Sequence, residues 1–114
     1  MRNWPERVLD ILEAIERIER YASSGRERFE SDELVQTWVV HNLEIIGEAA
    51  AKLGDDFHVR HQSVPWPQIV AMRNILIHEY FGIDFAEVWQ VVVRDLPPLK
   101  AYLQTLLVEE RTLE

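Results

Sequence analysis

The segment MRNILIHEYFGID, residues 72–84, gathers side chains that could bind a phosphate or move a proton: Arg73, Asn74, His78 and Tyr80. An arginine presents a planar fork of N–H donors that matches two phosphate oxygens. A histidine exchanges its proton near neutral pH, and the partial negative charge at the end of a helix favours its charged form. These residue types in one short segment indicate chemistry on a phosphate group.

This set could cleave RNA without a metal or another cofactor. His78 would move the proton, and Arg73 would stabilise the charge that builds on the scissile phosphate. The 2′-hydroxyl of the substrate would be the nucleophile, already held next to its target. The expected product is a 2′,3′-cyclic phosphate.

The spacing of the two residues limits how they could act together. Residues five apart on a straight helix point about 140° apart, at roughly 100° per residue. Arg73 and His78 could converge if the helix bends or loosens near His78, which Gly82 makes plausible, or if a second copy of the chain supplies one of them. Spacing alone also allows a plainer interpretation, with a salt-bridged arginine, a surface histidine and Tyr80 as an aromatic at the edge of the core.

Helices are predicted for nearly all of the chain. Apolar residues recur at three- and four-residue steps, and the expected helices span about 4–22, 32–53, 67–81, 84–95 and 96–108. Ser31, Asp84 and Asp95 are the expected N-caps, and residues 54–67 are expected to form a loop. The fold class is therefore all-α, a single-domain up-and-down bundle of four to five helices over residues 1–114.

The helix expected over residues 32–53 is apolar around much of its circumference, which predicts a central position or a subunit interface. Its remaining polar line includes His41, Glu44 and Glu48, a spacing compatible with metal ligation. One helix supplies too few ligands, so no metal site is predicted. Glu48 is expected instead to pair with an arginine across the bundle, with Arg73 as the candidate it would orient.

Composition narrows the function further. The chain has 114 residues, no cysteine and a net charge of −8. General nucleic-acid binders are usually basic, so RNA would have to bind at a local site; His58, Arg60 and His61 could add positive charge there, although a solvated loop is the plainer interpretation. No signal peptide or membrane-spanning run is recognisable, and the expected location is the cytoplasm.

Beyond these patterns, the sequence resembles the HepT-like toxins of the HEPN superfamily, which are small all-α ribonucleases. The resemblance rests on RNILIHEY, in which Arg73 and Asn74 are followed by His78 after four intervening residues and by Tyr80 two further on. Other segments agree in order along almost the whole chain: RVLDILEAIERIERY, IGEAAAKL, VPWPQIVAMRN and DLPPL.

That resemblance implies properties that composition and spacing do not. Members are homodimers whose two motifs face one cleft. They resemble the toxin of a toxin–antitoxin pair whose antitoxin is a minimal nucleotidyltransferase, thought to attach AMP to the motif tyrosine, here Tyr80. Two functions follow: a metal-independent endoribonuclease toxin that AMPylation silences, or a non-catalytic helical module that binds a nucleotidyltransferase or a nucleotide.

Overall fold

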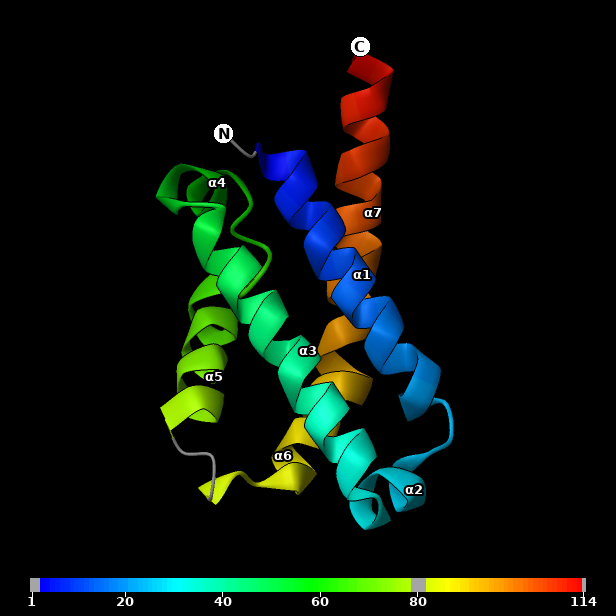
Figure 1. Ribbon diagram of the computed structural model, residues 1–114. Coiled ribbons are helices and arrows are strands. Elements are labelled where there is room, and N and C mark those ends of the chain that lie inside the picture. Colours follow the sequence, from blue (N-terminus) through cyan, green and yellow to red (C-terminus); the bar gives the residue numbers. More distant parts are fainter. Residues whose placement is uncertain (1–2, 79–81, 114) are drawn as a thin grey trace.

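The computed structural model describes residues 3–78 and 82–113 (Figure 1). Its long helices are α1 (Trp4–Ala22), α3 (Glu33–Lys52), α5 (Trp66–His78) and α7 (Leu96–Leu113). Shorter elements lie between them: α2 (Arg26–Ser31), α4 (Asp55–Arg60), α6 (Phe85–Gln90) and the π-helical segment η2 (Val91–Asp95). The described residues form no strand, and the long helices alternate in direction (Figure 1), so the predicted all-α up-and-down bundle is confirmed.

Helix α3 is the centre of the bundle, as its broad apolar surface predicted. It packs against both α1 and α5. Its most buried side chains recur at three- and four-residue steps, and each is at most 6% exposed: Val35, Val39, Leu43, Ile46 and Ala50. A second apolar stripe runs beside these residues on α3 and begins at Leu34. It is less completely buried, because Leu34 is 82% exposed.

Two short helices occupy segments that the sequence predicted to be irregular. Each begins directly after a glycine with positive φ, Gly25 at 95° and Gly54 at 88°, a conformation that glycine adopts at little cost. Each then buries one phenylalanine in the core, Phe29 in α2 and Phe57 in α4. Six-residue helices of this kind are stabilised by that tertiary contact, which hydrophobic periodicity does not reveal.

Three predicted caps have different outcomes. Asp84 caps α6 as expected, since its Oδ1 accepts from Ala86 N at 2.9 Å and from Glu87 N at 3.3 Å. Ser31 is the last residue of α2, and its neighbour Asp32 caps α3, so the prediction for Ser31 was wrong.

Asp95 was also wrongly predicted as an N-cap, because the helical chain is continuous through this residue. It passes from α6 through η2 into α7, with Leu96 N donating to Val91 O, five residues back. Pro97 and Pro98 have no N–H to donate to a preceding turn. A wider turn just before them lets the helix continue where the sequence predicted a break.

In the described part of the chain, no helix combines the length and the apolar character needed to cross a membrane.

Candidate functional site

Helix α5 carries the motif arginine on the side that faces α3. Leu76 is buried, and Met72 packs against the same core, which fixes the rotation of α5. Arg73 is half-buried beside them, and Asn74 is exposed. The guanidinium Nη1 donates to Asn74 Oδ1 at 3.4 Å, a long hydrogen bond that leaves most of the donor fork available.

Gly47 of α3 forms the seat on which Arg73 rests. A Cβ atom at position 47 would overlap the Cβ of Arg73, and would also lie 3.1 Å from its Cγ and 3.3 Å from Ile69 O. Only glycine therefore allows α5 to approach α3 this closely. A glycine inside a helix costs about 1 kcal/mol of stability relative to alanine. The position of Gly47 inside a helix was therefore a sign, readable from the sequence, that another segment packs closely there. The sequence did not show that this segment is the part of α5 that carries Arg73.

Glu48 does not form the ion pair predicted for it. Its Oε1 lies 3.1 Å from Lys52 Nζ, one turn along the same helix. Lys52 is accordingly the main cause of the lowered pKa of Glu48, and the positive charges of Arg73 and Arg7 lower that pKa further. Glu48 therefore forms its ion pair with Lys52, and its interaction with Arg73 is a longer-range electrostatic one.

The remaining motif residues are only partly described. The α-helix continues through His78, so the backbone of α5 does not loosen between Arg73 and His78, and the two backbone positions lie about 140° apart around the helix axis. The side chain of His78 and the whole of Tyr80 lie outside the described residues.

The histidines after α3 belong to the packed structure of α4 and do not form a solvated basic loop. His58 stacks on Trp66 with ring centroids 5.0 Å apart, and its Nε2 lies 2.7 Å from Ala50 O. His61 Nδ1 lies 2.8 Å from the hydroxyl of Tyr102. Burial lowers the pKa of His61, and the charge of Arg60 lowers it further, so His61 is a poor source of positive charge for RNA.

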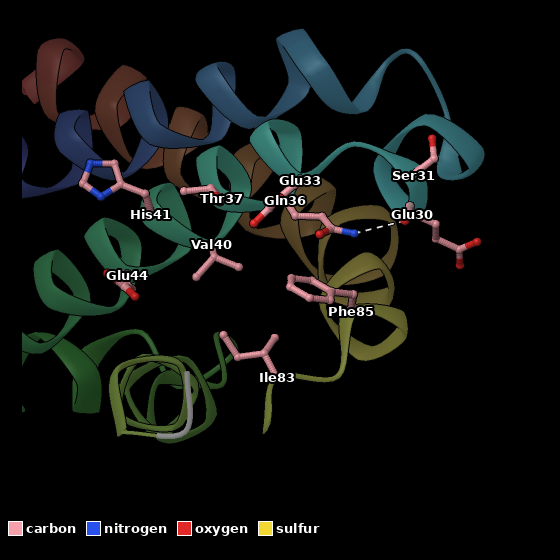
Figure 2. Close-up of a pocket in the computed structure, with 10 residues that line it drawn as sticks. All are labelled: Glu30, Ser31, Glu33, Gln36, Thr37, Val40, His41, Glu44, Ile83 and Phe85. Atoms are coloured by element: carbon pink, nitrogen blue, oxygen red, sulfur yellow. Dashed lines mark hydrogen bonds between the residues drawn. The ribbon is translucent and has the colours of Figure 1, made fainter. Parts of the chain in front are cut away.

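A groove of about 640 Å³ runs along the N-terminal half of α3. Figure 2 shows Gln36, Val40 and Glu44 along α3, opposite Ile83 and Phe85. Its other lining residues are Glu30, Ser31, Glu33, Thr37 and His41. Within residues 3–78 and 82–113, no three histidine or carboxylate side chains come close enough to hold a metal ion. The metal spacing noted for His41, Glu44 and Glu48 therefore does not correspond to a ligand cluster there.

Comparison with known proteins gives a consistent family. Residues 11–106 match the protein-family model described as "HepT-like: Ribonuclease HepT-like". The chain is 40% identical over 106 residues to "Probable ribonuclease HepT" of Thermococcus cleftensis, which covers 92% of this chain and 96% of that relative. It is 36% identical over 110 residues to a "Putative RNase" of Caldanaerobacter subterraneus subsp. tengcongensis, covering 96% of each chain. A "Putative RNase" of Methanocaldococcus jannaschii is 38% identical over 94 residues, covering 82% of this chain and 86% of that relative. No solved structure gives a significant match.

Proposed function

Since the chain belongs to the HepT-like ribonuclease family and is a ribonuclease of that type, we propose that it is the metal-independent endoribonuclease toxin of a toxin–antitoxin pair. Arg73 and His78 are its catalytic residues, and Asn74 holds the arginine. The observation that carries this proposal is the seat of Arg73 on Gly47, which fixes the stem of the arginine while its guanidinium has one long hydrogen bond to Asn74. A fixed stem with available donors suits a group that must meet a phosphate.

The proposed reaction is an in-line transfer within the RNA. The 2′-oxygen attacks the adjacent phosphorus and loses its proton, the bond from phosphorus to the 5′-oxygen breaks, and that oxygen gains a proton. His78 moves a proton in this step, and Arg73 binds the non-bridging oxygens, where negative charge accumulates. The products are a 2′,3′-cyclic phosphate and a 5′-hydroxyl.

We further propose that a homodimer completes the site. On one chain, positions 73 and 78 lie about 140° apart around the axis of α5, so one copy is poorly placed to present both residues to a single phosphate. Ile75 and Ile77, which lie between Asn74 and His78 within the motif, are 54% and 45% exposed, which supports a partner surface beside α5. A second copy would bring its own motif to the same cleft.

Regulation would act on Tyr80. A minimal nucleotidyltransferase antitoxin would attach AMP to its hydroxyl, placing bulk and negative charge beside the phosphate site. Tyr80 lies seven positions after Arg73 in the sequence. The phosphate of the AMP would therefore compete with substrate for the same guanidinium.

The test is cleavage of a labelled RNA in EDTA by the wild type, Arg73→Ala and His78→Ala, each purified without the antitoxin and shown by mass to carry no AMP. We expect the wild type to leave a 2′,3′-cyclic phosphate. Loss of a catalytic proton-transfer group typically costs about 10²–10⁴ in rate, so each variant should lose at least a hundredfold. Equal cleavage by His78→Ala would remove His78 from the mechanism.

The net charge of −8 and the acidic groove favour a second candidate, a non-catalytic module that binds a nucleotidyltransferase or a nucleotide. Absence of cleavage by the unmodified wild type, with the partner still bound by wild type and His78→Ala alike, would establish the module and end the enzyme proposal.

A further inference from the structure

The acidic groove continues the contact between α3 and α5 beyond the end of α5. Gly47 meets Arg73 and Ile69, and the two helices run in opposite directions (Figure 1). Moving five residues from Arg73 toward the end of α5 therefore corresponds to moving a similar distance from Gly47 toward the start of α3. The backbone of His78 therefore lies level with residues 40–44, of which Val40, His41 and Glu44 line the groove.

The groove also lies on the same face of α3 as the seat of Arg73. Val40, Glu44 and Gly47 follow one another at steps of four and three residues, which share one face of a helix. An RNA strand whose phosphate is bound by Arg73 would therefore have a neighbouring nucleotide at the entrance of this groove.

The lining repels the phosphate backbone and suits a different part of RNA. Its lining includes three acidic residues, Glu30, Glu33 and Glu44, and neither lysine nor arginine is among the described residues that line it. Its apolar wall consists of Val40, Ile83 and Phe85. A group with flat apolar faces and N–H donors on its edge fits this combination, and a nucleobase is such a group.

Phe85 is held in place from behind. Its ring packs edge-on against Phe29, with centroids 6.1 Å apart, and Phe29 in turn lies 5.3 Å from the ring of Trp89 in the core. Figure 2 shows the ring of Phe85 extending toward Val40, with Ile83 also across the groove from Val40. A pre-positioned aromatic wall loses little freedom when a base packs on it.

Among the three carboxylates, Glu44 is the one available to a ligand within the groove. Glu30 is paired with Arg26 at 2.8 Å, and Glu33 is exposed at the first turn of α3. Glu44 is half-buried and is the closest of the three to Gly47 along the helix; within the described part of the chain it forms no ion pair.

We propose that this groove is a nucleobase subsite of the ribonuclease, selective for guanine, with Glu44 as the acceptor and Phe85, Val40 and Ile83 as the wall. Guanine presents two adjacent donors, N1–H and N2–H, that match the two oxygens of one carboxylate. Adenine and cytosine present one donor beside an acceptor nitrogen, and uracil presents one donor between two carbonyls. The assignment deepens the proposed function and depends on it for the position of the scissile phosphate.

The test uses trinucleotides built on 2′-deoxyribose, which lack the attacking hydroxyl and cannot be cleaved, with guanine, hypoxanthine or adenine as the central base. Backbone amide NMR shifts of residues 40, 44 and 83 report occupancy of the groove. We expect the guanine trimer to bind about tenfold or more tightly than the hypoxanthine trimer, which lacks the N2 amino group. Glu44→Gln should abolish that preference. Glu33→Gln, a matched loss of charge on the exposed rim, should keep it.

Equal dissociation constants for the three trimers would overturn the subsite. So would amide shifts produced only by an arginine-rich hexapeptide, which would make the groove a peptide site. Because binding does not require cleavage, the two proposals fail separately. An enzyme that cleaves RNA without this preference keeps its function and loses the subsite, whereas guanine binding by a protein that cleaves nothing leaves a nucleobase pocket without the ribonuclease.

Discussion

At the residue scale, the contact between Gly47 and Arg73 is the clearest link between packing and chemistry. Position 47 is buried and lies directly against the Cβ and Cγ atoms of Arg73, the arginine proposed to be catalytic. A side chain there would have to push α5 away, and a displacement of about 1 Å can cost a hundredfold in rate when it moves a catalytic group. Gly47 is therefore a positioning residue for Arg73.

Gly47→Ala should lower kcat by about tenfold to a hundredfold. Overpacking at a buried position should also cost about 1–3 kcal/mol of stability. The measurement is kcat and KM on a labelled RNA beside urea unfolding. Since binding and transition-state stabilisation both depend on the guanidinium, we expect Arg73→Ala to add little further loss to Gly47→Ala.

Two controls separate positioning from simple destabilisation. Val39→Ala removes core volume from the same helix away from Arg73 and should lower stability while kcat changes less than threefold. Gly82→Ala adds its Cβ to open space and should leave stability unchanged. A fall in kcat that follows stability equally in Val39→Ala and Gly47→Ala would argue against the positioning role.

At the scale of elements, a partly buried polar contact joins α7 to the end of α4, between Tyr102 and His61, the residue that follows α4. His61 also packs on Phe57, with ring centroids 4.3 Å apart. Burial and Arg60 lower the pKa of His61, and Glu109 opposes them weakly. The folded protein thus binds this proton less readily than the unfolded chain does. The resulting stability is complete above the ordinary pKa of 6.5 and is lost as the pH falls below it toward the folded value.

We therefore expect the urea midpoint of the wild type to fall between pH 7.5 and pH 5.0 by more than that of His61→Gln, which cannot take up this proton. Both proteins share every other titrating group, including His58 and Glu109, so the difference between the two pH dependences isolates His61. Identical pH dependences would show that the contact with Tyr102 does not couple to protonation.

How much of the fold the sequence predicts depends on the length of each element. The long helices were predictable because many residues repeat the same apolar step, and the N-cap Asp84 was predictable from local chemistry. Helices α2 and α4 were not, since each depends on one phenylalanine whose burial is decided by distant helices. The π-helical turn was not predictable either, because proline indicates a missing donor and does not specify how the chain will compensate.

The site shows the same division. Arg73 and Asn74 were identified from residue type and spacing, and the structure places Arg73 half-buried against α3 with the exposed Asn74 hydrogen-bonded to its guanidinium. The pairing of Glu48 was predicted wrongly, because a lysine four residues away competes with any partner across the bundle. The roles assigned to Gly47 and to the groove require the register of α3 against α5, which no single-helix pattern contains.

At the scale of the whole molecule, the charge of −8 constrains how RNA can bind. A basic nucleic-acid binder neutralises many phosphates and releases many counterions. Here the candidate cationic contacts to RNA are Arg73 and a charged His78, and a homodimer would contain each of them twice. His61 is not a further cationic contact, because its lowered pKa favours the neutral ring. Binding should therefore depend on a few strong contacts.

The salt dependence measures that number. For single strands, log K falls with log[salt] at a slope of about −0.7 per neutralised phosphate. With about two to three phosphates contacted, we expect log(kcat/KM) to fall as log[salt] rises, with a slope of about −2 or shallower. The measurement covers KCl concentrations from about 50 to about 300 mM. A slope of about −4 or steeper would require an extended basic path and would contradict a local site. Arg73→Lys, which retains the charge, is the matched control and should keep the slope.

The alternating directions of the helices also determine where a tag or a fused protein can be attached without approaching the site. The start of α1 and the end of α7 lie together at the end of the bundle that carries α4 (Figure 1). The end of α5 lies toward the opposite end, as does the first half of α3, whose residues line the groove. The bundle measures 46 Å along its longest axis. An affinity tag, a surface linker or a fused protein attached at either terminus would thus be separated from the substrate by much of the length of the bundle. Immobilised through either end, the protein would still present its motif and its groove to RNA in solution.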